Sequence, residues 1–169
     1  MITNLDPAVL PAATGSYTHG VLVENPSRVV FVSGQVPWGD EDGVVPTDFA
    51  EQCRMTWRNV LAVLAEADMG VADLAKVTIY LSDRRYRALN GEIRAEVLGE
   101  HRPALTIIIA EIYAEEWLLE IEAVAATVIG RRHRGVRRLA TTARGLARRR
   151  HSPGQSRRRL PERRPRSPS

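Results

Sequence analysis

The chain has 169 residues, 44% of them hydrophobic and 26% charged, which favours a single globular domain. Its net charge of +4 is the sum of an acidic body and a basic C-terminal segment. Residues 1–129 hold nine Lys and Arg against nineteen Asp and Glu, whereas residues 130–169 hold fifteen Arg against one Glu. The single cysteine, Cys53, excludes an internal disulfide and a zinc site made of cysteine pairs. The sequence has no secretory leader pattern at Met1 and no apolar run of membrane-spanning length, so we expect a cytoplasmic protein with no membrane partner.

The first part of the chain predicts two strands after an irregular lead-in. Residues 1–15 contain two prolines and a glycine, which favour turns, so this segment is expected to be irregular. Residues 16–24 carry Val21 and Val23 at alternate positions, and residues 28–36 are richer in valine, so both segments are expected to be strands. Ser33 and Gly34 lie near the end of the second strand, where a glycine lets a ligand or another backbone approach closely.

Two amphipathic helices are predicted, each followed directly by a strand. The first begins after Asp48, with Glu51 completing a capping pattern, and ends at Gly70. The second begins after Asp83 and ends at Gly99. Their apolar stripes at helical spacing are Phe49, Cys53, Trp57, Val60, Leu61 and Leu64 in the first and Tyr86, Leu89, Ile93 and Val97 in the second.

Two residues of these helices have competing interpretations. Cys53 lies on the apolar stripe, so we interpret it as a small core side chain rather than as a nucleophile. Asn90 lies beside the second stripe, and by its helical position alone it is predicted to be exposed.

Three further strands are considered in the second half of the body. Residues 74–81 alternate apolar and polar side chains, and residues 106–113 are β-branched. Residues 118–126 fit a helix by composition and a strand by alternation; as a strand they place Glu120 and Glu122 on one face. The order of elements indicates α/β or α+β layering, with helices on one sheet face and another subunit on the other.

The segment from residue 130 to 169 is expected to be a disordered tail, separate from the domain of residues 1–129. It is rich in Arg, Pro and Ser and has too few apolar side chains for a core. Such a tail binds nucleic acid weakly through phosphates, although no aromatic side chain is present there to stack on bases. The same composition would also arise if GC-rich DNA were read past the natural end in another frame, and both interpretations stay open.

Six motifs, in this order, resemble the Rid family, also called YjgF/YER057c/UK114. They are Gly15-Ser16-Tyr17, Val30 to Pro37, Asp73 to Asp83, Asn90, His101 to Ala104, and Glu120 to Ala125. The resemblance covers about residues 15 to 126 and identifies residues 118–126 as a strand. It implies a chorismate-mutase-like α+β fold, a six-stranded mixed sheet backed by two helices, in a homotrimer. Small-molecule sites are then expected in the clefts between subunits, without a metal or other cofactor.

The resemblance also implies roles for individual residues. Deaminating members hydrolyse 2-imino acids, or their enamine tautomers, to 2-keto acids and ammonia. A glutamate at the position of Glu120 is expected to position or activate the attacking water. Tyr17 and Asn90 match residues that line the cleft, and Ser33 and Gly34 belong to a matching motif and are expected to contact the substrate.

Leu105 is the main departure from the family pattern. In deaminating members an arginine at this position binds the substrate carboxylate through a bidentate pair, and leucine has no donor. Arg102 is not expected to replace this arginine. In many members of the family a cysteine stands at the position of Ile107. Leu105 and Ile107 are expected to line the cleft, which predicts a neutral or hydrophobic ligand and casts doubt on 2-imino acid deamination.

Three functions are compatible with the sequence. The first is a hydrolase of an imine, enamine or related reactive metabolite with altered substrate choice. The second is a non-catalytic trimer that binds a metabolite or partner protein in the same clefts. The third is a nucleic-acid activity, which the acidic body disfavours because it repels phosphates.

Overall fold

The computed structural model describes residues 1–38 and 44–128, so the predictions for the Arg-rich segment lie outside the described residues. The elements are β1 (Ile2–Leu5), β2 (Gly20–Val23), β3 (Pro26–Gln35), α1 (Phe49–Glu66), the 3-10 helix η1 (Val71–Asp73), β4 (Leu74–Leu81), the 3-10 helix η2 (Arg84–Tyr86), α2 (Arg87–Leu98), β5 (Ala104–Ile109) and β6 (Leu119–Val128). None of the helices in this part of the chain has the length and apolar character needed to span a membrane.

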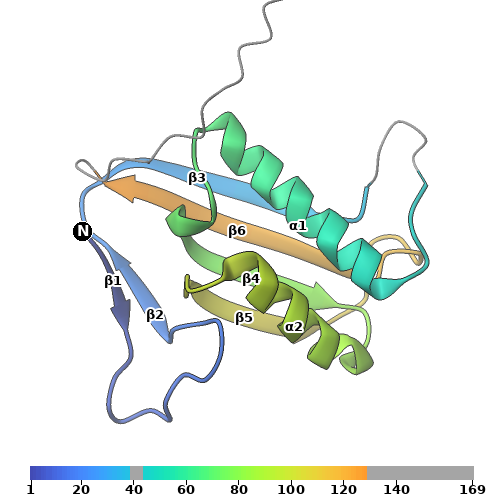
Figure 1. Cartoon of the computed structure of the whole chain (residues 1–169), viewed down its shortest axis with the longest axis horizontal. Helices are drawn as coiled ribbons and strands as arrows, with labels where there is room; N and C mark the ends of the chain where they lie inside the picture. The colour runs from blue at the N-terminus through green and yellow to red at the C-terminus, as the bar shows by residue number, and fades with distance from the viewer. Residues whose placement is uncertain (39–43, 129–169) are drawn as a thin grey trace, which may run out of the picture. The chain divides into compact units, whose positions relative to one another are not determined.

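The strands form two sheets (Figure 1). β3, β6, β4 and β5 make a four-stranded mixed sheet in that spatial order, in which only the β4–β5 pair is parallel. β1 and β2 form a separate antiparallel pair. Both helices lie on one side of the four-stranded sheet (Figure 1), so the predicted α+β fold with two helices and a mixed sheet is confirmed.

The core lies between the helices and one face of the four-stranded sheet. Alternation along β4 and β6 directs Ile79 and Ile121 to this face, where both are fully buried. They pack with the predicted stripe of α1, including Trp57 and Cys53. The interpretation of Cys53 as a core residue is confirmed, and burial raises the pKa of its thiol to about 12.

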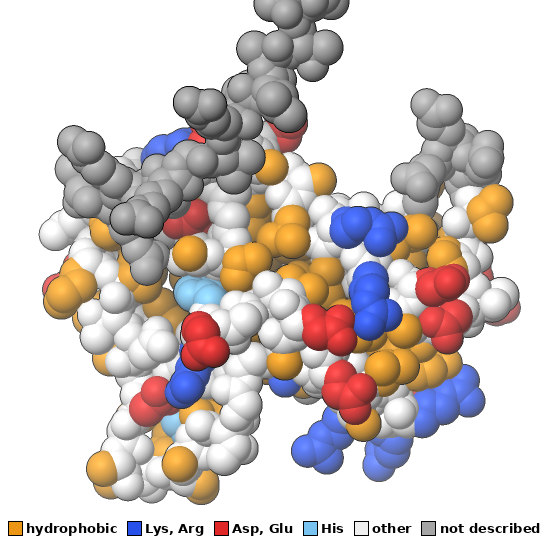
Figure 2. Space-filling view, in the orientation of Figure 1, with side chains coloured by type: hydrophobic (Ala, Val, Ile, Leu, Met, Phe, Trp, Pro, Cys, Tyr) orange, Lys and Arg blue, Asp and Glu red, His pale blue; other side chains and the backbone are white. Residues whose placement is uncertain are grey.

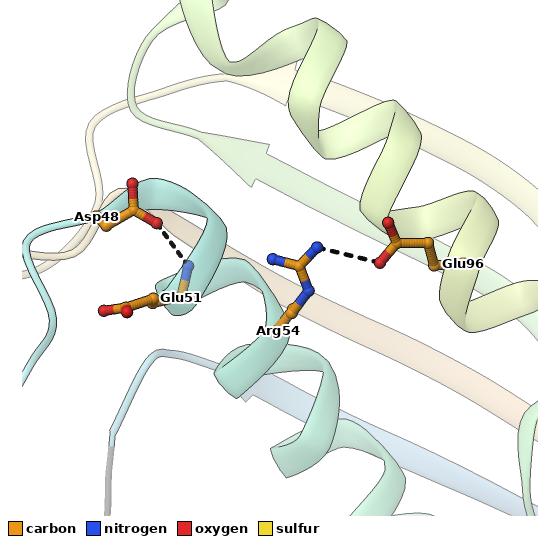
Figure 3. A network of polar contacts seen from close by, with 4 residues as sticks. All are labelled: Asp48, Glu51, Arg54 and Glu96. Carbon is orange, nitrogen blue, oxygen red and sulfur yellow. Dashed lines mark hydrogen bonds and ion pairs between the residues drawn. The ribbon is translucent and has the colours of Figure 1, made fainter.

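Local polar contacts fix where the helices start and how they are tied together (Figure 3). The Asp48 side chain accepts a hydrogen bond of 3.0 Å from the backbone N–H of Glu51, as the capping pattern predicts. Arg54 of α1 forms an exposed ion pair of 3.2 Å with Glu96 of α2. This surface pair contributes little to stability, so the buried face does most to hold the two helices against the sheet.

Several sequence expectations differ from the structure. Residues 1–15 are predicted to be irregular because of their prolines and glycine, but they contain strand β1. The strands expected at residues 16–24 and 106–113 are shorter, and the single six-stranded sheet is not observed among the described residues. The chain turns between β2 and β3 at Asn25, whose φ of 48° is left-handed, and β2 pairs with β1.

Candidate functional site

A groove of about 800 Å³ lies between α2 and the outer strand β5. It is lined by Thr14, Tyr17, Arg84, Arg85, Arg87, Ala88, Gly91, Arg94, Leu105 and Ile107. Figure 2 shows Lys and Arg side chains gathered around the start of α2, at the lower right of the view. The groove therefore has a basic wall from η2 and α2 and an apolar wall from β5.

The β5 wall is explained by strand alternation. Leu105 pairs with Val77 and Ile107 pairs with Ile79, so both side chains face the helices and not the open side of the sheet. α2 leaves this outer strand partly uncovered: Leu105 is half-buried and Ile107 is 37% exposed. The register with β4 therefore fixes the direction of both side chains.

Tyr17 reaches the groove because the segment before β2 is attached to the start of β5. The backbone N–H of Thr18 donates to the carbonyl of Pro103 at 3.1 Å, and Thr18 forms an isolated parallel bridge with Ala104. Tyr17 and Leu105 thus lie on the same groove although 88 positions separate them in the sequence. The structure therefore brings these two predicted residues together, and their role in binding stays a prediction.

Arg94 is the most enclosed of the basic groove residues. It is half-buried, and its Nε donates to Ser16 Oγ at 2.9 Å. Its Nη1 is buried and has no hydrogen-bond partner among the described residues. Burial lowers the pKa of the Arg94 guanidinium. The exposed Arg85, by contrast, already donates to the Tyr86 hydroxyl at 2.7 Å and lies 3.8 Å from the Asp83 carboxylate.

A second group of predicted site residues lies at the other side of the sheet. Glu120 of β6 is half-buried on the open face, beside Gly34 of β3, and the preceding Ser33 is exposed. A Cβ atom on Gly34 would lie 1.6 Å from Glu120 Oε1, so only glycine leaves room for the carboxylate in this position. Within the described chain, the Glu120 carboxylate forms no side-chain hydrogen bond or ion pair.

The two groups do not meet within one chain. Glu120 pairs with Tyr80 of β4, which pairs with Ile108 of β5, so these three share the open face. Leu105 and Ile107 belong to the opposite, helix-covered face by strand alternation. Within the described residues of one chain, Glu120 and the groove therefore do not form a single site.

Asn90 departs from its sequence-based position. It is completely buried rather than exposed, and it does not line the groove. Both side-chain amide atoms lack a hydrogen-bond partner among the described residues. Its expected contact with substrate is therefore not seen in the single chain.

Other candidates lie outside the groove or have structural roles. Arg102 is exposed and does not line the groove. His101 Nε2 lies 2.7 Å from the Leu74 carbonyl, and His19 Nε2 lies 2.8 Å from the Pro11 carbonyl. Across residues 1–38 and 44–128, no group of three or more His, Cys, Asp or Glu side chains is arranged to hold a metal ion.

Sequence reasoning missed the basic wall and one supporting residue. Arg87, Gly91 and Arg94 follow i, i+4, i+7 spacing, a signal for a shared helix face that was present in the sequence. Gln52 is buried and bridges α1 to the segment before β6: its Nε2 donates to the carbonyls of Pro46 and Glu116 at 2.6 and 2.9 Å, and its Oε1 accepts from the N–H of Leu118 at 2.8 Å. No local sequence pattern predicts these hydrogen bonds, because they join residues far apart in the sequence.

Comparison with known proteins identifies relatives of the body of the chain. Residues 8–127 match the family model described as Endoribonuclease L-PSP. The RutC family protein PYRAB12510 of Pyrococcus abyssi is 34% identical over 116 residues, covering 68% of this chain and 89% of that protein. The 2-iminobutanoate/2-iminopropanoate deaminase of Escherichia coli K12 is 32% identical over 118 residues, covering 68% and 90%.

Solved structures share the fold. A Rid-family protein from Yersinia pestis, YyfB, of unknown function, superposes with a TM-score of 0.64 at 24% identity, covering 74% of this chain and 98% of that one. Escherichia coli TdcF, solved with bound serine, gives a TM-score of 0.57 at 29% identity, covering 75% and 99%. The matched family model, these identities and the shared fold agree with the motifs found in the sequence, and the chain belongs to the Rid/YjgF/L-PSP (RutC) family.

Proposed function

We propose that this protein hydrolyses a small reactive imine or enamine in clefts between the subunits of a homotrimer, with Glu120 as the general base. The observation that carries this proposal is the Glu120 carboxylate on the open sheet face, in a space that Gly34 keeps clear. It has no charged partner among the described residues that would occupy its lone pairs. A carboxylate in this state is suited to accept a proton from an attacking water.

The reaction needs little more than a positioned base. Water adds to the C=N carbon while one of its protons passes to Glu120, and Glu120 delivers this proton to the imine nitrogen, which gives a neutral carbinolamine. Glu120 then takes the hydroxyl proton as the carbon–oxygen double bond forms and the carbon–nitrogen bond breaks. It delivers this second proton to the departing nitrogen, so the net change is the conversion of imine and water to a carbonyl compound and ammonia.

A trimer is supported by the separation of the two residue groups and by the open face itself. Phe31 is 79% exposed on this face, and Val29 and Ile108 are also exposed large hydrophobic residues. Apolar side chains gathered on one face favour burial against another copy of the chain. Association there would also allow Glu120 of one subunit to approach the groove of its neighbour.

The relatives support a small-molecule function. One is named a 2-iminobutanoate/2-iminopropanoate deaminase, and TdcF was crystallised with serine. Leu105, however, gives β5 no donor for a substrate carboxylate, so the substrate or its mode of binding differs from the family pattern. The same feature favours a second candidate, a trimer that binds a metabolite or partner without turnover.

The deciding experiment measures ammonia release from freshly generated 2-iminopropanoate and from a panel of neutral and aromatic imines. We expect wild type to release ammonia from at least one of these compounds and Glu120→Gln to lose about 100-fold or more of kcat. Glu122→Gln is the matched control, because this carboxylate lies two residues along the same face and contacts Tyr80. Binding without turnover of any imine by wild type would exclude the hydrolase and leave the binding trimer.

A further inference from the structure

The groove concentrates positive charge in an otherwise acidic body. Four of the nine Lys and Arg residues of positions 1–129 line it, although this part of the chain has a net charge of −10. No Asp or Glu is among the described residues that line the groove. No ion pair with a described carboxylate is formed by Arg84, Arg87 or Arg94. The local charge is therefore not balanced by the groove itself.

Helix geometry explains how the arginines share one cavity. Arg87, Gly91 and Arg94 lie on one face of α2, and Arg87 and Arg94 are separated by about two turns, roughly 10 Å along the axis. A Cβ on Gly91 would have no atom within 4 Å, so this position of the helix face opens onto free space. An anion in the groove would therefore lie near the positive side chains of η2 and α2.

Arg94 is the side chain best prepared to bind such an anion. The hydrogen bond from its Nε to Ser16 Oγ fixes one edge of the guanidinium, at the segment that also carries Tyr17. Its remaining nitrogens have no acceptor among the described residues, and Nη1 is already removed from the surface. A planar, partly desolvated guanidinium with unused donors favours a carboxylate, which accepts two parallel hydrogen bonds.

We infer that the α2–β5 groove binds the carboxylate of a small organic acid, with Arg94 as the anchoring residue and Leu105 and Ile107 against its alkyl part. This inference rests on the proposed function, because Tyr17, Leu105 and Ile107 are the substrate-binding residues expected there. It replaces the neutral ligand predicted from sequence. That prediction considered the apolar β5 wall and not the arginines that α2 places opposite it.

The test is isothermal titration calorimetry on the full chain with three probes: 2-oxobutanoate, inorganic phosphate and the neutral ketone 2-butanone. We expect 2-oxobutanoate to bind most tightly and Arg94→Gln to weaken it by about 10-fold to 100-fold, the usual effect of losing a hydrogen bond to a charged group. Arg58→Gln, an exposed change of the same charge on α1, is the matched control and should leave the affinity unchanged.

Arg94→Lys keeps the charge but removes the planar fork, so we expect an affinity between those of wild type and Arg94→Gln. It also keeps the test valid if the glutamine variant fails to fold. Equal binding of 2-butanone and 2-oxobutanoate, tighter binding of phosphate, or unchanged affinity in both Arg94 variants would each overturn the inference. Turnover is measured separately: an inactive wild type that binds 2-oxobutanoate through Arg94 refutes the hydrolase and supports this anchor.

Discussion

The contact between Gly34 and Glu120 gives the sharpest prediction about the proposed reaction. In Gly34→Ala, the new Cβ would lie 1.6 Å from Glu120 Oε1, whereas ordinary contacts begin near 3.4 Å. The carboxylate must therefore move by about 2 Å. Misplacing a reacting group by about 1 Å can reduce a rate by about 100-fold, so we expect kcat for ammonia release to fall at least that far.

Stability should respond differently from activity. Glu120 Oε1 is the end of a flexible, half-buried side chain, so it can move without disturbing the backbone. Replacing glycine by alanine also restricts the unfolded chain, and we expect the free energy of unfolding to change by less than about 1 kcal/mol. Thermal unfolding of Gly34→Ala beside wild type measures this change.

Gly70→Ala is the matched control, because a Cβ there meets no atom within 4 Å. It should leave both kcat and stability close to wild type. Full activity in Gly34→Ala would refute the argument that the Glu120 position is essential. An equal loss in Gly70→Ala would show that the assay reports general disturbance of the fold.

Three further predictions concern the core, the thiol and the groove. Gln52→Leu removes three hydrogen bonds between this buried side chain and backbone groups, and should lower the free energy of unfolding in urea by about 3 kcal/mol; a loss below about 1 kcal/mol would contradict this role. Cys53, with its pKa raised to about 12 by burial, should react with a thiol reagent at pH 8 only after unfolding, and rapid reaction of the folded protein would show local opening. Leu105→Arg adds a second guanidinium to the groove, on the wall that faces Arg94, and should tighten 2-oxobutanoate binding by about 10-fold in calorimetry; unchanged affinity would show that an arginine on β5 does not reach a carboxylate held by Arg94.

Local sequence patterns determined the elements that build the core. The cap at Asp48, the apolar stripe through Trp57 and the alternation along β4 depend on neighbours within a few positions, and all appear in the structure. Pattern alone did not identify β1, because this strand has only four residues and precedes a run of turn-forming residues. It also left residues 118–126 between helix and strand until the family motifs were considered.

Candidate site residues could be named from the sequence and its family motifs, but the contacts that bring some of them together could not. Tyr17 and Leu105 share a groove because Thr18 bridges to the start of β5, a contact between distant segments. Glu120 lies on the opposite face because the β4–β6 register sets its direction. These relations depend on strand pairing, which local propensity does not specify.

The sequence by itself determined the family motifs, the two helices and the core position of Cys53, and it predicts that Leu105 stands where deaminating relatives carry an arginine. Only the tertiary structure decided that Gly34 makes room for Glu120 and that Asn90 is buried. It also decided that arginines of η2 and α2 face the apolar β5 wall across one groove. Periodicity specifies the face of an element on which a residue lies, whereas packing specifies what that face meets.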